Sequence, residues 1–76
     1  MRKAGNYPEA IVQYTKALQI LPVHFKALFN RGFAYDKLGD FDKAIKDYSQ
    51  AIELDDKNPY AYYNRGISYD RKGDFE

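Results

Sequence analysis

The sequence contains no cysteine and no tryptophan, and it has a single histidine among its 76 residues. Without cysteine, the chain has neither a disulfide nor a thiolate metal site, so its stability has to come from packing. We therefore expect no metal ion and no cofactor. Lysine and arginine total 12 against 11 aspartate and glutamate residues, which gives a net charge of +1. A chain this close to neutral lacks the positive field that attracts nucleic acid, so we expect no nucleic-acid partner.

Long apolar runs are also missing. The apolar stretches, such as residues 20–23, are far shorter than the roughly 20 residues that span a bilayer. The first residues, Met1 to Pro8, contain no apolar core of the kind found in a secretory signal peptide. The sequence therefore predicts a soluble, cytoplasmic chain with no membrane partner.

The sequence is rich in aromatic residues, with eight tyrosines and five phenylalanines, and several of them recur at a fixed distance. When the sequence is aligned with itself at an offset of 34 residues, 15 of the 42 pairs are identical, against about two or three for unrelated sequence. The tripeptide Asn-Arg-Gly at 30–32, for example, returns at 64–66. The chain is therefore interpreted as a 34-residue repeat, with one complete copy and a partial copy on either side.

Within each repeat, the periodicity is that of two helices. Apolar and small residues recur at spacings of three and four, as on the buried side of a helix, at Leu28, Gly32 and Tyr35. A second run with the same spacing extends from Phe41 to Ile52. The sequence predicts four helices, at roughly residues 8–21, 24–38, 41–54 and 59–72, and no strands.

Turn and capping residues mark the expected helix ends. Gly39 has the conformational freedom that a helix C-terminus needs, and Asp40 can cap the next helix. Gly73, one repeat later, is likewise expected to be a helix break. Asparagine followed by proline at 58–59 is typical of an N-cap and a first helical position. Asn6 with Glu9 resembles a capping box for the first helix.

Small residues predict close packing between the helices. Gly32 and Ala44 lie where a larger side chain would hold the two helices of a repeat apart, and Ala51 does the same toward the next repeat. Tyr35 and Tyr48 are expected to fill the space beside them.

In its period and its recurring residues, the sequence resembles the tetratricopeptide repeat (TPR) family. In the complete copy, the family's positions are occupied by Leu28, Gly32, Tyr35, Gly39, Asp40, Phe41, Ala44, Tyr48 and Ala51. They are occupied by Tyr62, Gly66, Tyr69 and residues 73–75 in the last copy, and by Gly5, Tyr7, Ala10, Tyr14, Ala17 and Pro22 in the first. The resemblance implies an all-α solenoid of antiparallel helix pairs, wound as a right-handed superhelix.

The same resemblance divides the chain into three parts. Residues 1–24 would be the second helix of a truncated repeat, residues 25–58 a complete repeat, and residues 59–76 the first helix of another truncated repeat. We therefore expect a fragment of a longer array, without the polar capping elements that such arrays normally have.

Two features depart from the family's pattern. Asp56 stands where TPR sequences usually have proline. Arg31 and Arg65 replace the usual leucine before the glycine. We expect each arginine to lay its stem along the helix pair and to keep its charged group in water.

Groups suited to catalysis are few. His24 has no cysteine or second histidine with which to share a metal or a nucleophile. Ser49 and Ser68 have no base near them by spacing, and Asp36 and Asp70 are expected to be solvated charges on helix surfaces. We therefore expect no enzymatic activity.

The resemblance implies an interaction surface instead, because in TPR proteins the first helix of each pair lines a concave groove that holds peptides. Here those positions fall on Lys26, Phe29, Asn30, Phe33, Asp36 and Lys37, and on Tyr60, Tyr63, Asn64, Ile67, Asp70 and Arg71. Two interpretations stay open. Either the aromatic rings pack on one another, or they form an apolar groove in which Asn30 and Asn64 bind a peptide main chain.

One well-known version of the family binds the acidic C-terminal tail of heat-shock chaperones through a clamp of lysine, asparagine and arginine side chains. Here Asn30 can supply one asparagine, but Tyr60 and Asn64 stand where the lysine and arginine are needed. If residues 25–38 are taken as the first groove helix instead, Phe29 and Phe33 stand where lysine and asparagine are needed. We therefore expect a different protein or peptide partner.

Two alternatives to a peptide-binding scaffold remain. The first is self-assembly into a homo-oligomer, in which Tyr7, Ile11 and Tyr14 of one molecule dock on Tyr62, Gly66 and Tyr69 of the next. Such a head-to-tail contact is heterologous and would propagate as an open stack. The second is a repeat segment whose parent chain carries an enzyme elsewhere.

Overall fold

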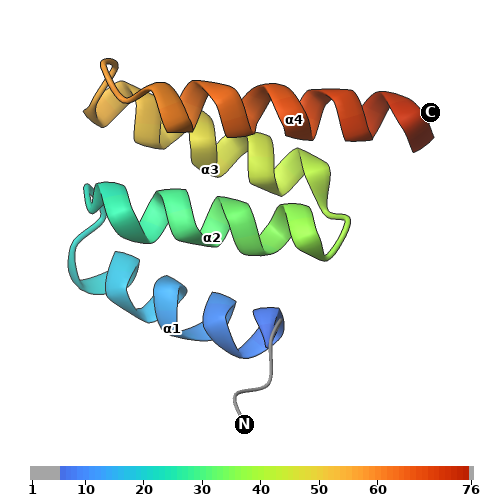
Figure 1. The fold of residues 1–76 in the computed structure, drawn as a ribbon. Coiled ribbons are helices and arrows are strands. Elements are labelled where there is room, and N and C mark those ends of the chain that lie inside the picture. Colours follow the sequence, from blue (N-terminus) through green and yellow to red (C-terminus); the bar gives the residue numbers. More distant parts are fainter. Residues whose placement is uncertain (1–5, 76) are drawn as a thin grey trace, which may run out of the picture.

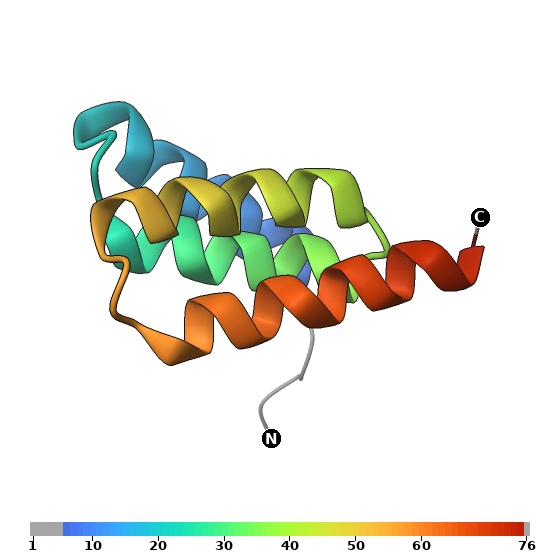
Figure 2. The ribbon, with the colours of Figure 1, turned by 90° about the horizontal axis from the view of Figure 1, so that it is seen from above.

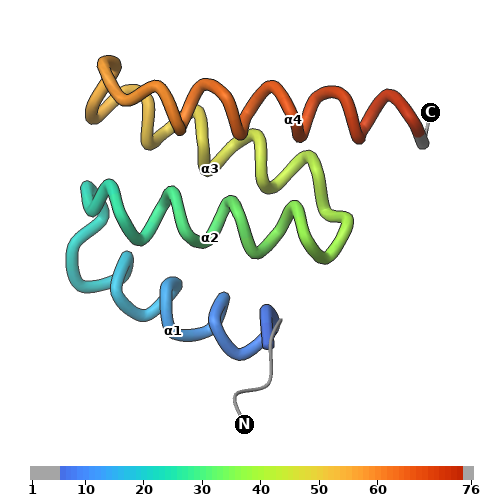
Figure 3. Tube along the Cα trace, in the orientation of Figure 1, coloured from blue at the N-terminus to red at the C-terminus, as the bar shows by residue number. Residues whose placement is uncertain are grey.

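The computed structural model describes residues 6–75, the last of them by its backbone alone. These residues form four helices: α1 (Tyr7–Ile20), α2 (Phe25–Lys37), α3 (Phe41–Leu54) and α4 (Pro59–Phe75). Consecutive helices run antiparallel, and the turns that join them lie at alternating ends of the stack (Figures 1 and 3). There is no strand in the described part of the chain, and the predicted all-α fold is confirmed.

The helices are stacked in chain order, so that each packs against the next, and α2 also contacts α4. Viewed from above, α2 and α4 lie toward one side of the array, and α3 lies toward the other (Figure 2). The array measures 34 × 34 × 21 Å. The first helices of the two repeats, α2 and α4, are therefore neighbours with one common side.

Most helix ends follow the local sequence signals. Gly39 adopts the left-handed conformation, with φ of +85°, and ends the turn after α2. The Asp40 carboxylate caps α3 by accepting a hydrogen bond of 3.4 Å from the Lys43 N–H. Asn58 caps α4 by accepting one of 2.9 Å from the Tyr60 N–H. The bounds of α1, α2 and α3 agree with the predicted ones to within one residue.

Other helix ends differ from the prediction. The Asn6 side chain makes no capping hydrogen bond, and the Glu9 carboxylate instead accepts one of 3.0 Å from the amide of Gln13, one turn further on. Gly73 does not end α4, which continues to residue 75. His24 caps α2, because its Nδ1 accepts a hydrogen bond of 3.2 Å from the Ala27 N–H.

The helices approach each other closely at Gly32, as predicted. A Cβ atom added there would lie 3.1 Å from two ring carbons of Tyr48 and 3.3 Å from the carbonyl oxygen of Ala44. Ala44, Tyr48 and Ala51 are all fully buried. Burial raises the pKa of the Tyr48 phenol well above its usual value, and the negative charges of Asp36 and Asp47 act in the same direction.

Arg31 contradicts the expectation that its charged group stays in water. Its guanidinium donates two hydrogen bonds to the Asp47 carboxylate, from Nε at 2.7 Å and from Nη2 at 2.9 Å. Its Nη1 donates a third, of 3.1 Å, to the hydroxyl of Thr15. The hydrogen bonds to Asp47 raise the pKa of Arg31, although partial burial acts against this. The arginine therefore joins α1, α2 and α3, because partners on both neighbouring helices lie within its reach.

Asp36 was expected to be a solvated charge on the groove side, but it is buried. Its side chain is buried between α2 and α4, where it accepts a hydrogen bond of 2.6 Å from the Ser68 hydroxyl. Arg71 approaches its other oxygen at 3.5 Å. The reason is the packing of α4 on α2, which covers Asp36 but leaves Asp70, one repeat later, exposed.

Candidate functional site

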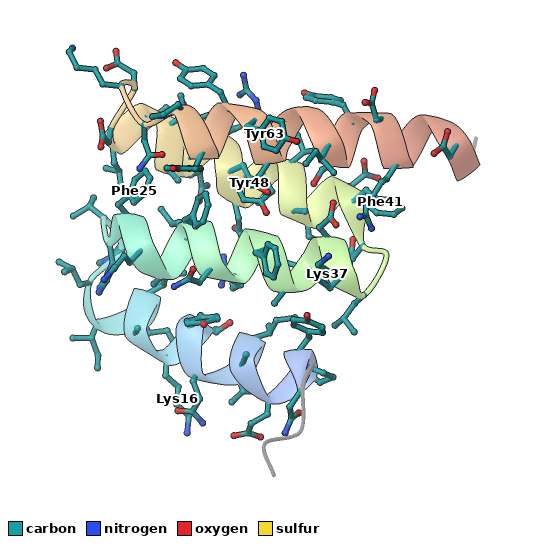
Figure 4. All side chains as sticks on the ribbon, viewed as in Figure 1. Lys16, Phe25, Lys37, Phe41, Tyr48 and Tyr63 are labelled. Carbon is teal, nitrogen blue, oxygen red and sulfur yellow. The ribbon has the colours of Figure 1, made fainter. Side chains whose placement is uncertain are left out.

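The predicted groove positions follow one side of α2 and α4. This side faces the viewer in Figure 4, where Lys37 and Tyr63 are labelled. The exposed positions are Lys26, Phe33, Lys37, Tyr60, Tyr63 and Arg71, and the half-buried ones are Asn30, Asn64 and Ile67. We call these residues the front face.

Phe29 was predicted to belong to this surface, but it is held in the packing. Its ring stacks on Phe25 with the centroids 5.9 Å apart. It also meets the buried ring of Tyr48 edge-on, at 5.6 Å. Because both contacts fix Phe29 between α2 and α3, we leave it out of the front face.

Phe33 lies at the junction of α1 and α2. Its ring makes a T-shaped contact with the ring of Tyr7, with the centroids 6.3 Å apart. The ammonium of Lys37 lies 5.1 Å from the centroid of the Phe33 ring, where a cation is attracted by the π electrons. Phe33 nevertheless remains 39% exposed. Its position is thus fixed while part of its ring stays accessible.

Tyr60 and Tyr63 are the most exposed rings of the front face, at 68% and 69%. Phe33 packs with Tyr7, and Phe29 packs with Phe25 and Tyr48, so the four predicted groove aromatics do not form one cluster with each other. The two tyrosines therefore offer apolar surface that the fold of the described residues does not use.

The two asparagines of the front face differ in what they can offer. Asn64 donates its amide N–H to the carbonyl oxygen of Tyr60, one turn earlier, at 2.8 Å. The Asn64 side-chain oxygen is then the group that can accept from a ligand. Asn30 makes no side-chain hydrogen bond with the described residues, so both its donor and its acceptor are available.

A second exposed surface lies on α4, on the side that corresponds to the α3-covered side of α2. We call Tyr62, Arg65, Gly66 and Tyr69 the outer face. Tyr62 and Tyr69 are 44% and 55% exposed, and a Cβ atom added at Gly66 would meet nothing within 4 Å. Arg65 was not among the predicted site residues, although its recurrence 34 residues after Arg31 was a signal in the sequence.

The α1 residues proposed for self-association are incompletely covered. Ile11 and Tyr14 are half-buried, and α1 contains no fully buried residue. The equivalent of Tyr14 one repeat later, Tyr48, is fully buried, whereas the equivalent of Ile11, Ile45, is half-buried as well. Tyr7 is half-buried and already packs against Phe33 within the chain, so less of its ring surface is available for contact with a second molecule.

Two hollows lie away from the front face. One, of about 290 Å³, is lined by Pro22, Val23, Leu28, Gln50, Glu53 and Leu54. The other, of about 260 Å³, is lined by Arg31, Tyr35, Lys43, Lys46, Asp47 and Gln50. Both lie beside α3, and neither includes a front-face residue.

The described residues show no arrangement suited to catalysis. Ser68 and Asp36 form a hydroxyl–carboxylate pair, but the hydroxyl is fully buried, so a substrate cannot reach it. Between residues 6 and 75, no three histidine, aspartate or glutamate side chains lie together as metal ligands would. Also within that range, no helix has the length and apolar character needed to cross a membrane.

Comparison with protein-family models identifies the class of protein. A TPR repeat model matches residues 1–39, and two tetratricopeptide repeat models match residues 25–58 and residues 48–76. No match was found among curated proteins. The chain belongs to the tetratricopeptide repeat family, whose repeats are non-enzymatic scaffolds that generally mediate protein–protein interactions.

Proposed function

We propose that this chain is a protein-interaction scaffold that binds a peptide or partner segment on its front face. The observation that carries this proposal is the exposure of Tyr60 and Tyr63 on the face that also carries Asn30, whose amide has no partner among the described residues. Aromatic rings supply contact area at low entropic cost, and an amide can pair with a peptide main chain. Packing of the four helices requires neither feature.

The chemistry of the front face defines the kind of ligand. We expect an extended or short helical peptide that is largely apolar and not dominated by acidic residues. An acidic chaperone tail is not the expected ligand, because Tyr60 and Asn64 stand where a carboxylate clamp needs cations. With only two helices contributing, the affinity should be micromolar or weaker. A cytoplasmic location belongs to the same proposal, because the chain has no cysteine for disulfides.

The proposal is tested with peptides selected from a random-sequence display library against the whole chain. Binding of the selected peptides is measured by calorimetry for the wild type, for Tyr60→Ser/Tyr63→Ser and for Asn30→Ala/Asn64→Ala. Tyr60→Ser/Tyr63→Ser should bind the peptides about tenfold or more weakly than the wild type. Asn30→Ala/Asn64→Ala should lose about 2 kcal/mol of binding free energy, because it removes both amides that would bond to the peptide main chain. Tyr62→Ser, which removes a tyrosine of the same helix from the outer face, is the matched control and should bind normally. Equal losses in all three variants would contradict a front-face site.

A second candidate function is head-to-tail self-assembly. It is favoured by one observation, the open outer face at Gly66, because the corresponding Gly32 is covered by Tyr48. Docking of one molecule's α1 on the next molecule's α4 would cover this surface. Sedimentation over a hundredfold range of concentration tests it, with Ile11→Asp and Tyr69→Asp expected to dissolve any oligomer. A constant mass of 8.9 kDa in a fully helical chain contradicts stacking.

A further inference from the structure

The two hollows beside α3 adjoin one another. Gln50 lines both, and together they run along α3 from Lys43 to Leu54. Arg31 lines one of them and donates hydrogen bonds to side chains of both α1 and α3. They lie on the α3 side of the array, away from the side toward which α2 and α4 lie (Figure 2). We call the two hollows together the back groove, and both helices that flank the complete repeat, α1 and α4, leave it open.

The hollow of about 260 Å³ is basic. Its charged lining residues are Arg31, Lys43, Lys46 and Asp47, which give it a net charge of +2. Because Asp47 is paired with Arg31, the two lysines carry this charge. The Lys43 ammonium lies 3.7 Å from the carboxylate of Asp40, in an exposed contact that contributes little. Lys46 has no ionic partner among the described residues. The hollow can therefore accept an anion without breaking a buried ion pair.

The ring of Tyr35 positions two of these cations. The guanidinium carbon of Arg31 lies 5.8 Å from the centroid of the ring, and the Lys43 ammonium lies 5.6 Å from it. Each terminal nitrogen of Arg31 uses one of its two N–H groups, so two donors remain. One repeat earlier, Glu9 and Val12 stand at the places of the two lysines of the hollow. The packing of the repeat therefore requires neither lysine.

The adjoining hollow, of about 290 Å³, is mainly apolar. It is lined by Pro22, Val23, Leu28 and Leu54, with Gln50 and the charged Glu53 completing its wall. In the turn after α3, Asp56 and Lys57 take the places of Pro22 and Val23, so the repeat does not require apolar residues there. The carboxylate of Glu53 opposes a further negative charge at this end of the groove. The back groove therefore suits a ligand with an anion at one end and an apolar group at the other.

We propose that the back groove binds a segment of a partner protein that carries a phosphorylated serine or threonine and an apolar residue three or four positions away from it. A phosphate has about two negative charges and three acceptor oxygens at neutral pH, which match Lys43, Lys46 and the remaining donors of Arg31. Lys46 and Leu54 are eight residues apart on α3, or about 12 Å along its axis. An extended chain covers this distance in about three to four residues. The site is separate from the front face and does not depend on the function proposed for that face.

The charge pattern of the groove favours such a segment over other anions. A nucleic acid or an anionic membrane would place negative charge along the whole groove, including beside Glu53, and the net charge of the chain is only +1. Free inorganic phosphate would leave the apolar half unused, where Val23 is 62% exposed. A single carboxylate side chain has one charge and two oxygens, so it matches the two lysines less well. The test includes the phosphate ion and the membrane.

The probe is a peptide library in which one phosphoserine is fixed and the positions around it vary without acidic residues. A matched library has serine in place of the phosphoserine. Both are passed over the immobilised whole chain, and the retained peptides are sequenced. The affinity of the most enriched phosphopeptide and of its serine counterpart is then measured by fluorescence anisotropy. Inorganic phosphate and vesicles that contain phosphatidylserine are tested as competitors.

Three variants locate the site. Lys43→Gln/Lys46→Gln removes the two lysines of the basic hollow, and Val23→Ser alters the apolar hollow. Lys26→Gln/Lys37→Gln is the matched control, because it removes two exposed lysines from the front face. All five substituted residues are exposed, so the variants should keep the fold, which circular dichroism verifies.

The wild type and the control should bind the phosphopeptide about tenfold or more tightly than its serine counterpart, and should select an apolar residue three or four positions from the phosphate. In Lys43→Gln/Lys46→Gln the ratio should fall to within about twofold, whereas Val23→Ser should keep the ratio and weaken the apolar selection. The proposal is overturned if no phosphopeptide is enriched, if the ratio survives in the double lysine variant, or if the control loses it. Equal displacement by an equimolar amount of inorganic phosphate would indicate a simple anion site, and binding of the vesicles in place of the peptides would indicate a membrane surface. Either result contradicts the proposal.

Discussion

The guanidinium of Arg31 and the carboxylate of Asp47 form two parallel hydrogen bonds that join α2 to α3. The Asp47 side chain is 3% exposed and that of Arg31 is 20% exposed. Removing both charges from water is costly, and only a paired geometry of this kind offsets that cost. The third hydrogen bond of Arg31, to Thr15, extends the connection to α1.

Replacing Asp47 with asparagine should lower the free energy of unfolding by about 3 kcal/mol, because it leaves a partly buried guanidinium without a countercharge. Urea unfolding followed by circular dichroism measures the change. Lys57→Gln, which breaks the exposed contact with Asp56, is the control and should change stability by less than about 0.5 kcal/mol. Similar effects from the two variants would show that Arg31 is solvated.

The two equivalent glycines of α2 and α4 should respond oppositely to the same substitution. Gly32→Leu forces a side chain against Tyr48 and the Ala44 carbonyl, and should cost about 3 kcal/mol or unfold the chain. Gly66→Leu meets open space and should stabilise the helix by about 0.5–1 kcal/mol through higher helix propensity. Thermal melts of both variants provide the measurement, and equal shifts in Tm would contradict the difference in packing.

Ser68→Ala removes the hydroxyl that donates to the buried carboxylate of Asp36. We expect a loss of about 1–3 kcal/mol, because the carboxylate keeps only the more distant Arg71. When Ser68→Ala is made in the Asp36→Ala variant, it should lower the free energy of unfolding much less, because no buried carboxylate is then left without its hydrogen bond. A double-mutant cycle by chemical denaturation measures the coupling, and additive effects would be inconsistent with this contact.

The buried phenol of Tyr48 should make stability fall above pH 10. An ordinary tyrosine ionises near pH 10, and burial raises the pKa of Tyr48 above that value. As pH rises beyond 10, the unfolded chain loses this proton and the folded chain retains it. The contribution of Tyr48 is therefore constant below pH 10 and decreases above it, by up to about 1.4 kcal/mol per pH unit. Between pH 9 and 11, the free energy of unfolding measured with urea should fall less steeply for Tyr48→Phe than for the wild type. If the two fall in parallel, ionisation of Tyr48 does not contribute.

Local sequence signals predicted the helices well but not every end. The letters Gly-Asp-Phe occur at residues 39–41 and again at 73–75. Gly39 takes a positive φ and the chain turns back as α3, whereas α4 runs through Gly73. The local sequence permits the turn, and packing of α3 on α2 selects it at Gly39. Periodicity therefore specifies a helix more reliably than glycine specifies its end.

The charged residues of the core were not predicted, because their partners are distant in sequence. Arg31 and Asp47 are 16 residues apart, and Asp36 and Ser68 are 32 apart. No helical spacing links such pairs, so the charges of Arg31 and Asp36 were assigned to the surface. The repeat did contain a signal, since Arg31 and Arg65 recur at a position where leucine is usual. Exposed residues such as Tyr60 and Tyr63 were predicted more easily, because the buried pattern of the repeat does not use them.

Backbone amide chemical shifts, recorded while a library-selected peptide is added to the 15N-labelled chain, test the central claim most directly. We expect the largest changes along the front face, at Asn30, Phe33, Tyr60, Tyr63 and Asn64. The amides of α3 and the exposed side of α1 should change little. Changes confined to α1 or to the outer face of α4, with none at the front-face residues, would contradict the proposed binding surface.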